Sequence, residues 1–116
     1  MVLAVKIKNK ETGEFYCKGG GFGKTGKAWT TIGYAKNAIC PMYFRYRHET
    51  FIQDHLKELQ SHFIVIHDDG RIEEIPVATY FYDYLKRTAR SERGIAVLNQ
   101  VIEYCKENNI DLEEDK

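Results

Sequence analysis

A glycine-rich stretch near the N-terminus has the residue types that bind phosphate. Residues 19–27 read Gly-Gly-Gly-Phe-Gly-Lys-Thr-Gly-Lys, with five glycines and two lysines in nine residues. Backbone amides in such a turn can approach an anion closely, and Lys24 and Lys27 supply positive charge beside them. The stretch therefore predicts an anion-binding loop. The alternative is a hairpin connection whose lysines only keep it soluble.

The stretch matches the G-x-G-x-x-G pattern but not the enzymes that use it. Dinucleotide-binding domains need a long helix after this loop, whereas residues 27–31 have a strand pattern. A P-loop needs a glycine five residues before Gly23, and Lys18 stands there. A chain of 116 residues is too short for a protein kinase. We therefore reject these three enzyme classes.

A second candidate site is the aromatic and basic segment Tyr43-Phe44-Arg45-Tyr46-Arg47. Aromatic side chains stack on nucleobases, with ~1–3 kcal/mol for each base, and arginine binds phosphate through two hydrogen bonds. The alternative places Tyr43 and Phe44 in the core with the arginines at its rim. Taken together, the two stretches predict a set of ligand-binding residues: Lys24, Lys27, Trp29, Lys36, Asn37, Tyr43, Arg45, Tyr46 and Arg47.

Residues for catalysis or metal binding are sparse in the sequence. His62 and His67 lack the Ser or Thr two positions later that paired-histidine phosphoesterases carry, since Ile64 and Asp69 stand there. The four histidines and three cysteines show no metal-ligand spacing, and no cysteine has an obvious histidine partner. We expect a binding protein with no cofactor and no metal. An enzyme remains the alternative, because sites assemble in space.

The net charge is zero, but the two halves of the chain differ in sign. Residues 1–50 carry nine Lys and Arg against three acids, a balance of +6, and residues 51–116 carry eight against fourteen, a balance of −6. The basic half could face an anionic ligand, either a nucleotide or a nucleic acid. Alternatively, the two halves attract each other within a chain or between subunits.

Composition indicates a compact domain outside the membrane. The hydrophobic share of 43% and the charged share of 29% are typical of globular proteins and argue against disorder. The longest apolar runs fall far short of the ~20 residues that span a bilayer. Met1-Val2-Leu3 leads into lysines instead of a signal-peptide core, and the unpaired cysteines indicate a reducing compartment. We expect a cytoplasmic protein with no membrane partner.

The elements that would position these residues are strands early and helices late. Residues 2–8 alternate apolar and basic, which predicts a half-buried strand with lysines on its open face. Further strands are expected at 14–18, 28–32, 62–67 and 71–75, and helices at 34–39, 51–60, 76–88 and 91–108. The predicted fold is α+β, a small antiparallel sheet of about five strands with the two C-terminal helices packed on it. Residues 1–110 form one domain, and residues 111–116 a charged, frayed tail.

The two C-terminal helices also predict self-association. Their apolar residues cover more than the single stripe that a surface helix needs: Tyr80, Phe81, Tyr82, Tyr84, Ile95, Ala96, Val97, Leu98, Val101, Ile102, Tyr104 and Cys105. An exposed aromatic and aliphatic surface usually marks an interface, and a symmetric dimer is its commonest form. We expect a homodimer or a larger assembly, with a monomer as the alternative.

Residues 5–40 contain a set of short motifs: Ile7-Lys8-Asn9-Lys10-Glu11-Thr12-Gly13, Phe15, Gly19-Gly20, Gly26-Lys27-Ala28-Trp29, Gly33 and Ala35-Lys36-Asn37. In these motifs the N-terminal third of the chain resembles small uncharacterised bacteriophage proteins. The resemblance implies a phage origin and the cytoplasm of a bacterial host, without implying an activity. Several phage proteins of this size block bacterial defence without being enzymes, by sequestering nucleotide immune signals or by blocking a defence protein; this link is an analogy of context.

The leading hypothesis is therefore a non-enzymatic phage protein that sequesters a phosphorylated nucleotide-type small molecule, an immune signal of anti-phage defence. The first alternative is a protein–protein inhibitor of a host defence factor, whose acidic C-terminal half mimics nucleic acid or docks the host protein. The second alternative is a nucleic-acid binder. The balanced net charge ranks it lower.

Overall fold

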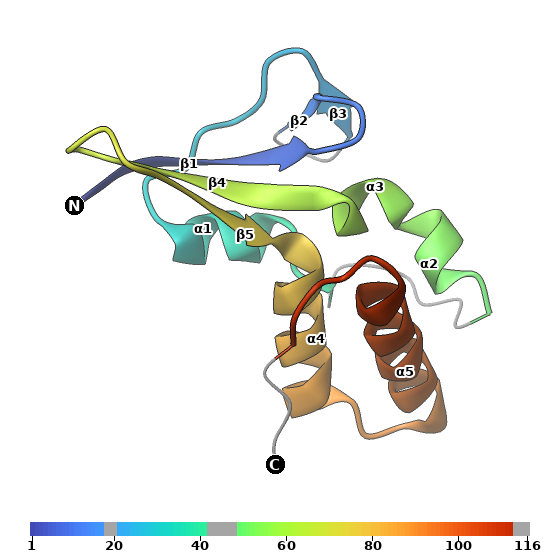
Figure 1. Ribbon diagram of the computed structural model, residues 1–116. Helices are drawn as coiled ribbons and strands as arrows, with labels where there is room; N and C mark the ends of the chain where they lie inside the picture. The colour runs from blue at the N-terminus through green and yellow to red at the C-terminus, as the bar shows by residue number, and fades with distance from the viewer. Residues whose placement is uncertain (18–20, 42–48, 113–116) are drawn as a thin grey trace.

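The computed structural model describes residues 1–17, 21–41 and 49–112 (Figure 1). Within these residues the chain forms one antiparallel five-stranded sheet of order β3-β2-β1-β4-β5. The strands are β1 (Val2–Asn9), β2 (Phe15–Tyr16), β3 (Phe22–Gly23), β4 (Ser61–His67) and β5 (Ile72–Pro76). The helices are α1 (Ile32–Ala38), α2 (Phe51–Asp54), α3 (Leu56–Leu59), α4 (Val77–Thr88) and α5 (Glu92–Glu107). The predicted α+β class, with α4 and α5 packed together against the sheet, is confirmed.

The long strands β1 and β4 form the centre of the sheet and give it two different faces. Val5, Ile7 and Phe63 are fully buried on one face, where α1 and α4 pack against the strands. Because side chains alternate along a strand, Lys6 and Ile64, which are paired across the two strands, point to the opposite face. We call this second face the open face. Figure 1 shows α1, α4 and α5 together on the side of the sheet opposite to this open face.

The N-terminal strands differ from the prediction in place and length. The expected strand at 28–32 is reduced to one bridge, in which Trp29 and Val5 exchange two backbone hydrogen bonds of 2.8 Å. The third N-terminal strand is instead β3, inside the glycine-rich stretch, and the strand expected at 14–18 shortens to β2. The reason is that β2 already pairs with β1 at Lys8, so only the first half of β1 has a free edge for Trp29.

The helix expected at 51–60 is broken into α2 and α3. The break falls at His55, whose backbone leaves the helical region at φ −122° and ψ 27°. Both short helices bury one large side chain, Phe51 in α2 and Leu59 in α3. Packing of these two side chains against the core overrides the local preference for one continuous helix.

The C-terminal helices form where the sequence predicts them, and α5 buries only part of its broad apolar surface. Its buried residues include Val97, Val101 and Tyr104, whereas Ile95 is 46% exposed. A Cβ on Gly94 would lie 3.2 Å from the Cβ of Ala89, so this glycine lets α5 start close to the end of α4.

The tyrosines and phenylalanine of α4 are mostly enclosed by the chain itself. Tyr80, Phe81 and Tyr82 are all buried. Ile110 and Leu112, which follow α5, also pack against the core. Leu112 belongs to the tail expected at 111–116, so the described part of that tail contributes to the core. Among the described residues, no helix has the length and apolar character needed to cross a membrane.

Candidate functional site

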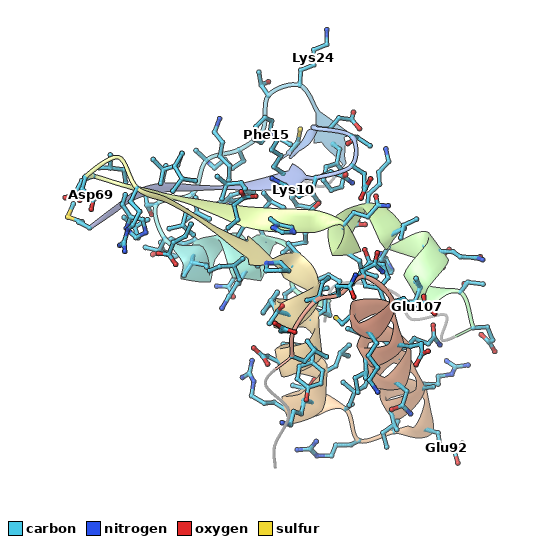
Figure 2. The ribbon with its side chains drawn as sticks, in the orientation of Figure 1. Lys10, Phe15, Lys24, Asp69, Glu92 and Glu107 are labelled. Carbon is cyan, nitrogen blue, oxygen red and sulfur yellow. The ribbon has the colours of Figure 1, made fainter. Side chains whose placement is uncertain are left out.

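The residues predicted to bind a ligand do not meet at one place in the described structure. Lys24 projects from the loop after β3, away from the sheet (Figure 2). Trp29 is half-buried and packs against the core, whereas Lys27 and Asn37 are exposed. Lys36 lies on the helical side, with its Nζ 5.5 Å from the ring centre of Tyr80. The other predicted residues lie outside the described residues: Tyr43, Arg45, Tyr46 and Arg47.

The glycine-rich stretch has a packing role where the structure describes it. A Cβ on Gly26 would lie 2.5 Å from the Cβ of Phe15 and 2.7 Å from the carbonyl oxygen of Tyr16. The backbone N–H of Lys27 donates to that same carbonyl, at 3.2 Å. The chain therefore needs a glycine at position 26 so that it can lie directly against β2.

The structure places a hollow of about 380 Å³ on the open face of the sheet. Four strands and the turn after β1 supply its lining residues, which are Lys6, Lys8, Lys10, Phe15, Ile64, Ile66, Ile72 and Glu74. Its floor is apolar, because Ile64 and Ile66 face the same way from β4 and Ile72 continues them on β5. Its rim carries three cations and one carboxylate.

Strand register sets the order of charges across this hollow. Lys8 is paired with Phe15 on β2 and with His62 on β4. One row along, Lys6 is paired with Ile64, and Ile64 with Glu74. Because neighbouring strands lie ~4.8 Å apart, Lys6 and Glu74 stand roughly 10 Å apart with the isoleucine between them. Lys6 and the carboxylate of Glu74 therefore lie at opposite sides of an apolar floor, whereas Lys10 lies beside the carboxylate.

Two of the lysines share one aromatic ring. The Nζ of Lys6 lies 5.0 Å from the ring centre of Phe15, and the Nζ of Lys8 lies 5.7 Å from it. Each ammonium is attracted to the face of the ring, by ~0.5–1 kcal/mol at an exposed site. Phe15 therefore attracts both ammonium groups at the edge of the hollow, beside the surface on which an apolar group could lie.

The carboxylate of Glu74 is the centre of a small polar cluster. Its Oε1 lies 2.6 Å from the Nζ of Lys10 and 3.7 Å from the Nδ1 of His62. The hydrogen bond from Lys10 is the main cause that lowers the pKa of Glu74 below its usual value. Glu74 is thus ionised at neutral pH, and it already neutralises one of the three lysines.

His62 borders the same cluster in its neutral form. Burial is the main cause that lowers its pKa below the ordinary value of 6.5. Its Nδ1 is inaccessible to solvent and has no hydrogen-bond partner in the described part of the chain. This nitrogen therefore lies enclosed beside the carboxylate of Glu74, 3.7 Å from its Oε1.

A buried asparagine fixes the turn that joins β1 to β2. Asn9 is fully buried, and its Nδ2 donates to the carbonyl oxygen of Lys57 at 3.1 Å and to the Oε1 of Gln60 at 3.2 Å. Its Oδ1 accepts from the backbone N–H groups of Glu11 at 2.8 Å and Thr12 at 3.0 Å. One side chain thus ties the turn to the end of α3 and sets the position of the residues on either side of it.

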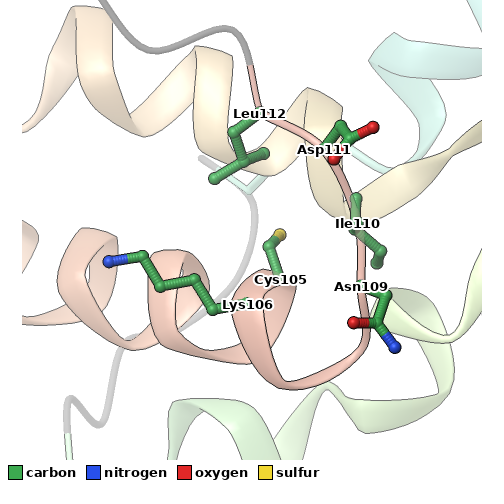
Figure 3. Close-up of a pocket in the computed structure, with 6 residues that line it drawn as sticks. All are labelled: Cys105, Lys106, Asn109, Ile110, Asp111 and Leu112. Carbon is green, nitrogen blue, oxygen red and sulfur yellow. The ribbon is translucent and has the colours of Figure 1, made fainter.

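A second hollow, of about 310 Å³, lies where the chain returns after α5 (Figure 3). Cys105 points from α5 toward the returning chain, between Lys106 and Ile110. Burial raises the pKa of the Cys105 thiol to about 11, so the thiol stays protonated at neutral pH and is a poor nucleophile. This hollow offers less chemistry than the open face.

The described side chains provide binding groups more readily than catalytic ones. Among the described residues, no three His, Cys, Asp or Glu side chains gather in a way that could hold a metal ion. The open face combines ammonium groups, an aromatic ring, an aliphatic floor and a carboxylate. These groups can hold a ligand that has both an anionic part and an apolar or planar part.

Sequence alone indicated one part of this site and missed the rest. The alternation in residues 2–8 placed the lysines on an open face, and the structure confirms that Lys6 and Lys8 lie there. Phe15, Ile64 and Glu74 carried no local signal that they belong beside these lysines. Comparisons of the chain with protein-family models, with curated proteins and with solved structures found no match.

Proposed function

We propose that the protein binds a phosphorylated, nucleotide-type small molecule on the open face of its sheet and releases it unchanged. The observation that carries this proposal is the pair of ammonium groups, Lys6 and Lys8, held around Phe15 at the edge of an apolar hollow. The volume of about 380 Å³ lies within the ~300–1,000 Å³ of typical small-molecule sites.

The two parts of a nucleotide match the two parts of the hollow. A phosphate group takes its positive partners from Lys6 and Lys8, and the base lies on the isoleucine floor with its edge near Phe15. Micromolar binding requires about 8 kcal/mol in total, so the charge interaction and the apolar contact both have to contribute.

The chemistry of the lining supports binding without conversion. Lys10 is occupied by Glu74, and the Nδ1 of His62 is inaccessible to solvent. In the phage setting that the sequence resemblance implies, a protein of this kind acts by removing a nucleotide immune signal from solution. The function is then measured as ligand withdrawn and returned intact.

The test is titration calorimetry with a panel of nucleoside mono-, di- and triphosphates, cyclic nucleotides and ADP-ribose. Wild type is compared with Lys6→Ala and Lys8→Ala, and with Lys106→Ala as a control that removes the same charge from exposed α5. We expect each open-face variant to weaken binding by about tenfold, which corresponds to ~1.4 kcal/mol. The control is expected to bind as wild type does.

Three results would contradict the proposal. One is no binding to any member of the panel. Another is an equal loss in Lys6→Ala and Lys106→Ala, which would show a general charge effect. The third is recovery of a changed ligand by chromatography after the complex is denatured. Weaker binding in Lys24→Ala and Lys27→Ala, without weaker binding in Lys6→Ala, would show that the ligand binds at the glycine-rich loop instead.

A further inference from the structure

We infer that Glu74 selects the ligand by accepting a hydrogen bond from it, so that the open face takes nucleoside phosphates in preference to bare phosphates. The inference rests on the proposed function and adds a specificity-determining residue to it. The ligand class that it names is a phosphorylated molecule with an amine or hydroxyl donor some distance from its phosphate.

An acidic residue is out of place in a simple anion site. Glu74 is the one acidic residue among the described residues that line the hollow. Its negative charge opposes every anion that approaches Lys6 and Lys8. A surface selected only for phosphate affinity would gain from a neutral residue at this position. The presence of the carboxylate therefore calls for a separate role.

Glu74 contributes little to the stability of the fold. The ion pair with Lys10 is exposed, with 40% and 43% of the two side chains accessible to solvent, and exposed pairs contribute little to folding. The neighbouring acid, Glu73, differs in this respect. It points to the other face of the sheet, where its Oε1 lies 2.6 Å from the Nε2 of the buried His67.

The surroundings of Glu74 allow its carboxylate to accept a hydrogen bond from a donor group on the ligand. Lys10 already donates a hydrogen bond to it at 2.6 Å, and Lys10 is an exposed residue beyond the end of β1 that an incoming amine or hydroxyl could displace. Beside it, the Nδ1 of His62 is buried and has no hydrogen-bond partner in the described chain. The carboxylate of Glu74 is therefore the acceptor at this side of the hollow that a ligand can reach.

Distance across the sheet separates this polar cluster from the phosphate end. Lys6 and Glu74 stand two strand spacings apart, roughly 10 Å, with Ile64 between them. A ligand that reaches both must carry its phosphate and its donor at opposite ends of an apolar or planar body. Nucleoside phosphates have this form, whereas inorganic phosphate and pyrophosphate do not.

The experiment compares two probes, adenosine monophosphate and pyrophosphate, in wild type, Glu74→Gln and Glu73→Gln. Glu73→Gln is the matched control, because it makes the same change on the same strand but on the other face. In Glu74→Gln we expect pyrophosphate to bind a few-fold more tightly, since a repelling charge is gone. We expect adenosine monophosphate to bind about tenfold more weakly, since a charged acceptor is lost.

The opposite directions of the two effects separate this role from a purely electrostatic one. Parallel tightening of both probes in Glu74→Gln would overturn the inference and leave the proposed function intact. Equal effects of Glu74→Gln and Glu73→Gln would overturn it as well. Absence of binding of either probe to wild type, with none in the wider nucleotide panel, would overturn the proposed function itself.

Discussion

The ammonium of Lys10 lies 2.6 Å from the carboxylate of Glu74, although 64 residues separate them in the chain. Lys10 follows the end of β1 and Glu74 belongs to β5, so the contact passes over β4 between them. The contact holds Lys10 and Glu74 at the side of the apolar hollow that lies away from Lys6. This one contact shows how the basic N-terminal and acidic C-terminal halves of the chain meet on a single surface.

The turn that supports the site depends on Asn9. Replacing Asn9 with Ala removes four hydrogen bonds of a fully buried amide and takes the side-chain acceptor from the backbone N–H groups of Glu11 and Thr12. We expect a loss of roughly 2–4 kcal/mol in the free energy of unfolding, measured by urea denaturation. Asn37→Ala, at an exposed position of α1, serves as the control and is expected to change stability by no more than about 0.5 kcal/mol. Equal effects of the two changes would contradict this role of Asn9.

Close packing of the glycine-rich stretch gives a second prediction. In Gly26→Ala the new methyl group would meet the Cβ of Phe15 at 2.5 Å, so Phe15 and β2 must move. We expect a destabilisation of ~1–3 kcal/mol together with weaker nucleotide binding. Gly33→Ala is the matched control, because its nearest neighbour would be 3.7 Å away and the residue lies inside α1. Gly33→Ala is expected to raise stability by up to ~1 kcal/mol. A loss of stability in Gly33→Ala equal to that in Gly26→Ala would refute the packing argument.

Burial of His62 predicts a dependence of stability on pH. Its folded-state pKa lies below the unfolded value of 6.5, so the unfolded chain takes up the proton first as pH falls. The contribution of neutral His62 is complete above pH 6.5 and is lost as pH falls below that value toward the folded pKa. We expect the urea midpoint to fall across this window in wild type. His62→Gln should show a smaller fall, and an unchanged slope in this variant would disprove the assignment.

Self-association remains a prediction of the sequence. Burial of Tyr80, Phe81 and Tyr82 within the chain removes most of the aromatic surface from which it was argued, and leaves Ile95 as the large apolar side chain that α5 exposes. The opposed charges of the two halves still allow one copy to meet another. Light scattering at micromolar concentration is expected to give about twice the chain mass of 13.5 kDa, and the mass of one chain would contradict it.

Local sequence patterns were sufficient for elements whose structure depends on near neighbours. Alternation in residues 2–8 predicted β1, and the strands expected at 62–67 and 71–75 left Asp68-Asp69-Gly70 for the turn between β4 and β5, where Gly70 has φ +87°. Ser91 begins α5 as predicted, with its Oγ accepting a hydrogen bond from the N–H of Gly94 at 3.1 Å. Each of these signals acts over a few residues, so no knowledge of the fold was needed.

Tertiary structure decided the features that depend on distant partners. The bridge at Trp29, the break at His55 and the exposure of Ile95 each follow from what packs against that residue. A strand or helix pattern states which residues share a face, but not which other element that face meets. Propensity therefore yields to packing wherever the two disagree.

The candidate site shows the same division. The sequence by itself determined that Lys6 and Lys8 share the open side of one strand. Only the sheet order and register decided that Phe15, Ile64 and Glu74 lie beside them. Strand pairing is set by burial of the opposite face against α1 and α4, and a slip of one residue would send every side chain of a strand to the other face. The hollow with its charged rim is therefore a product of long-range packing, which residue spacing along the chain does not encode.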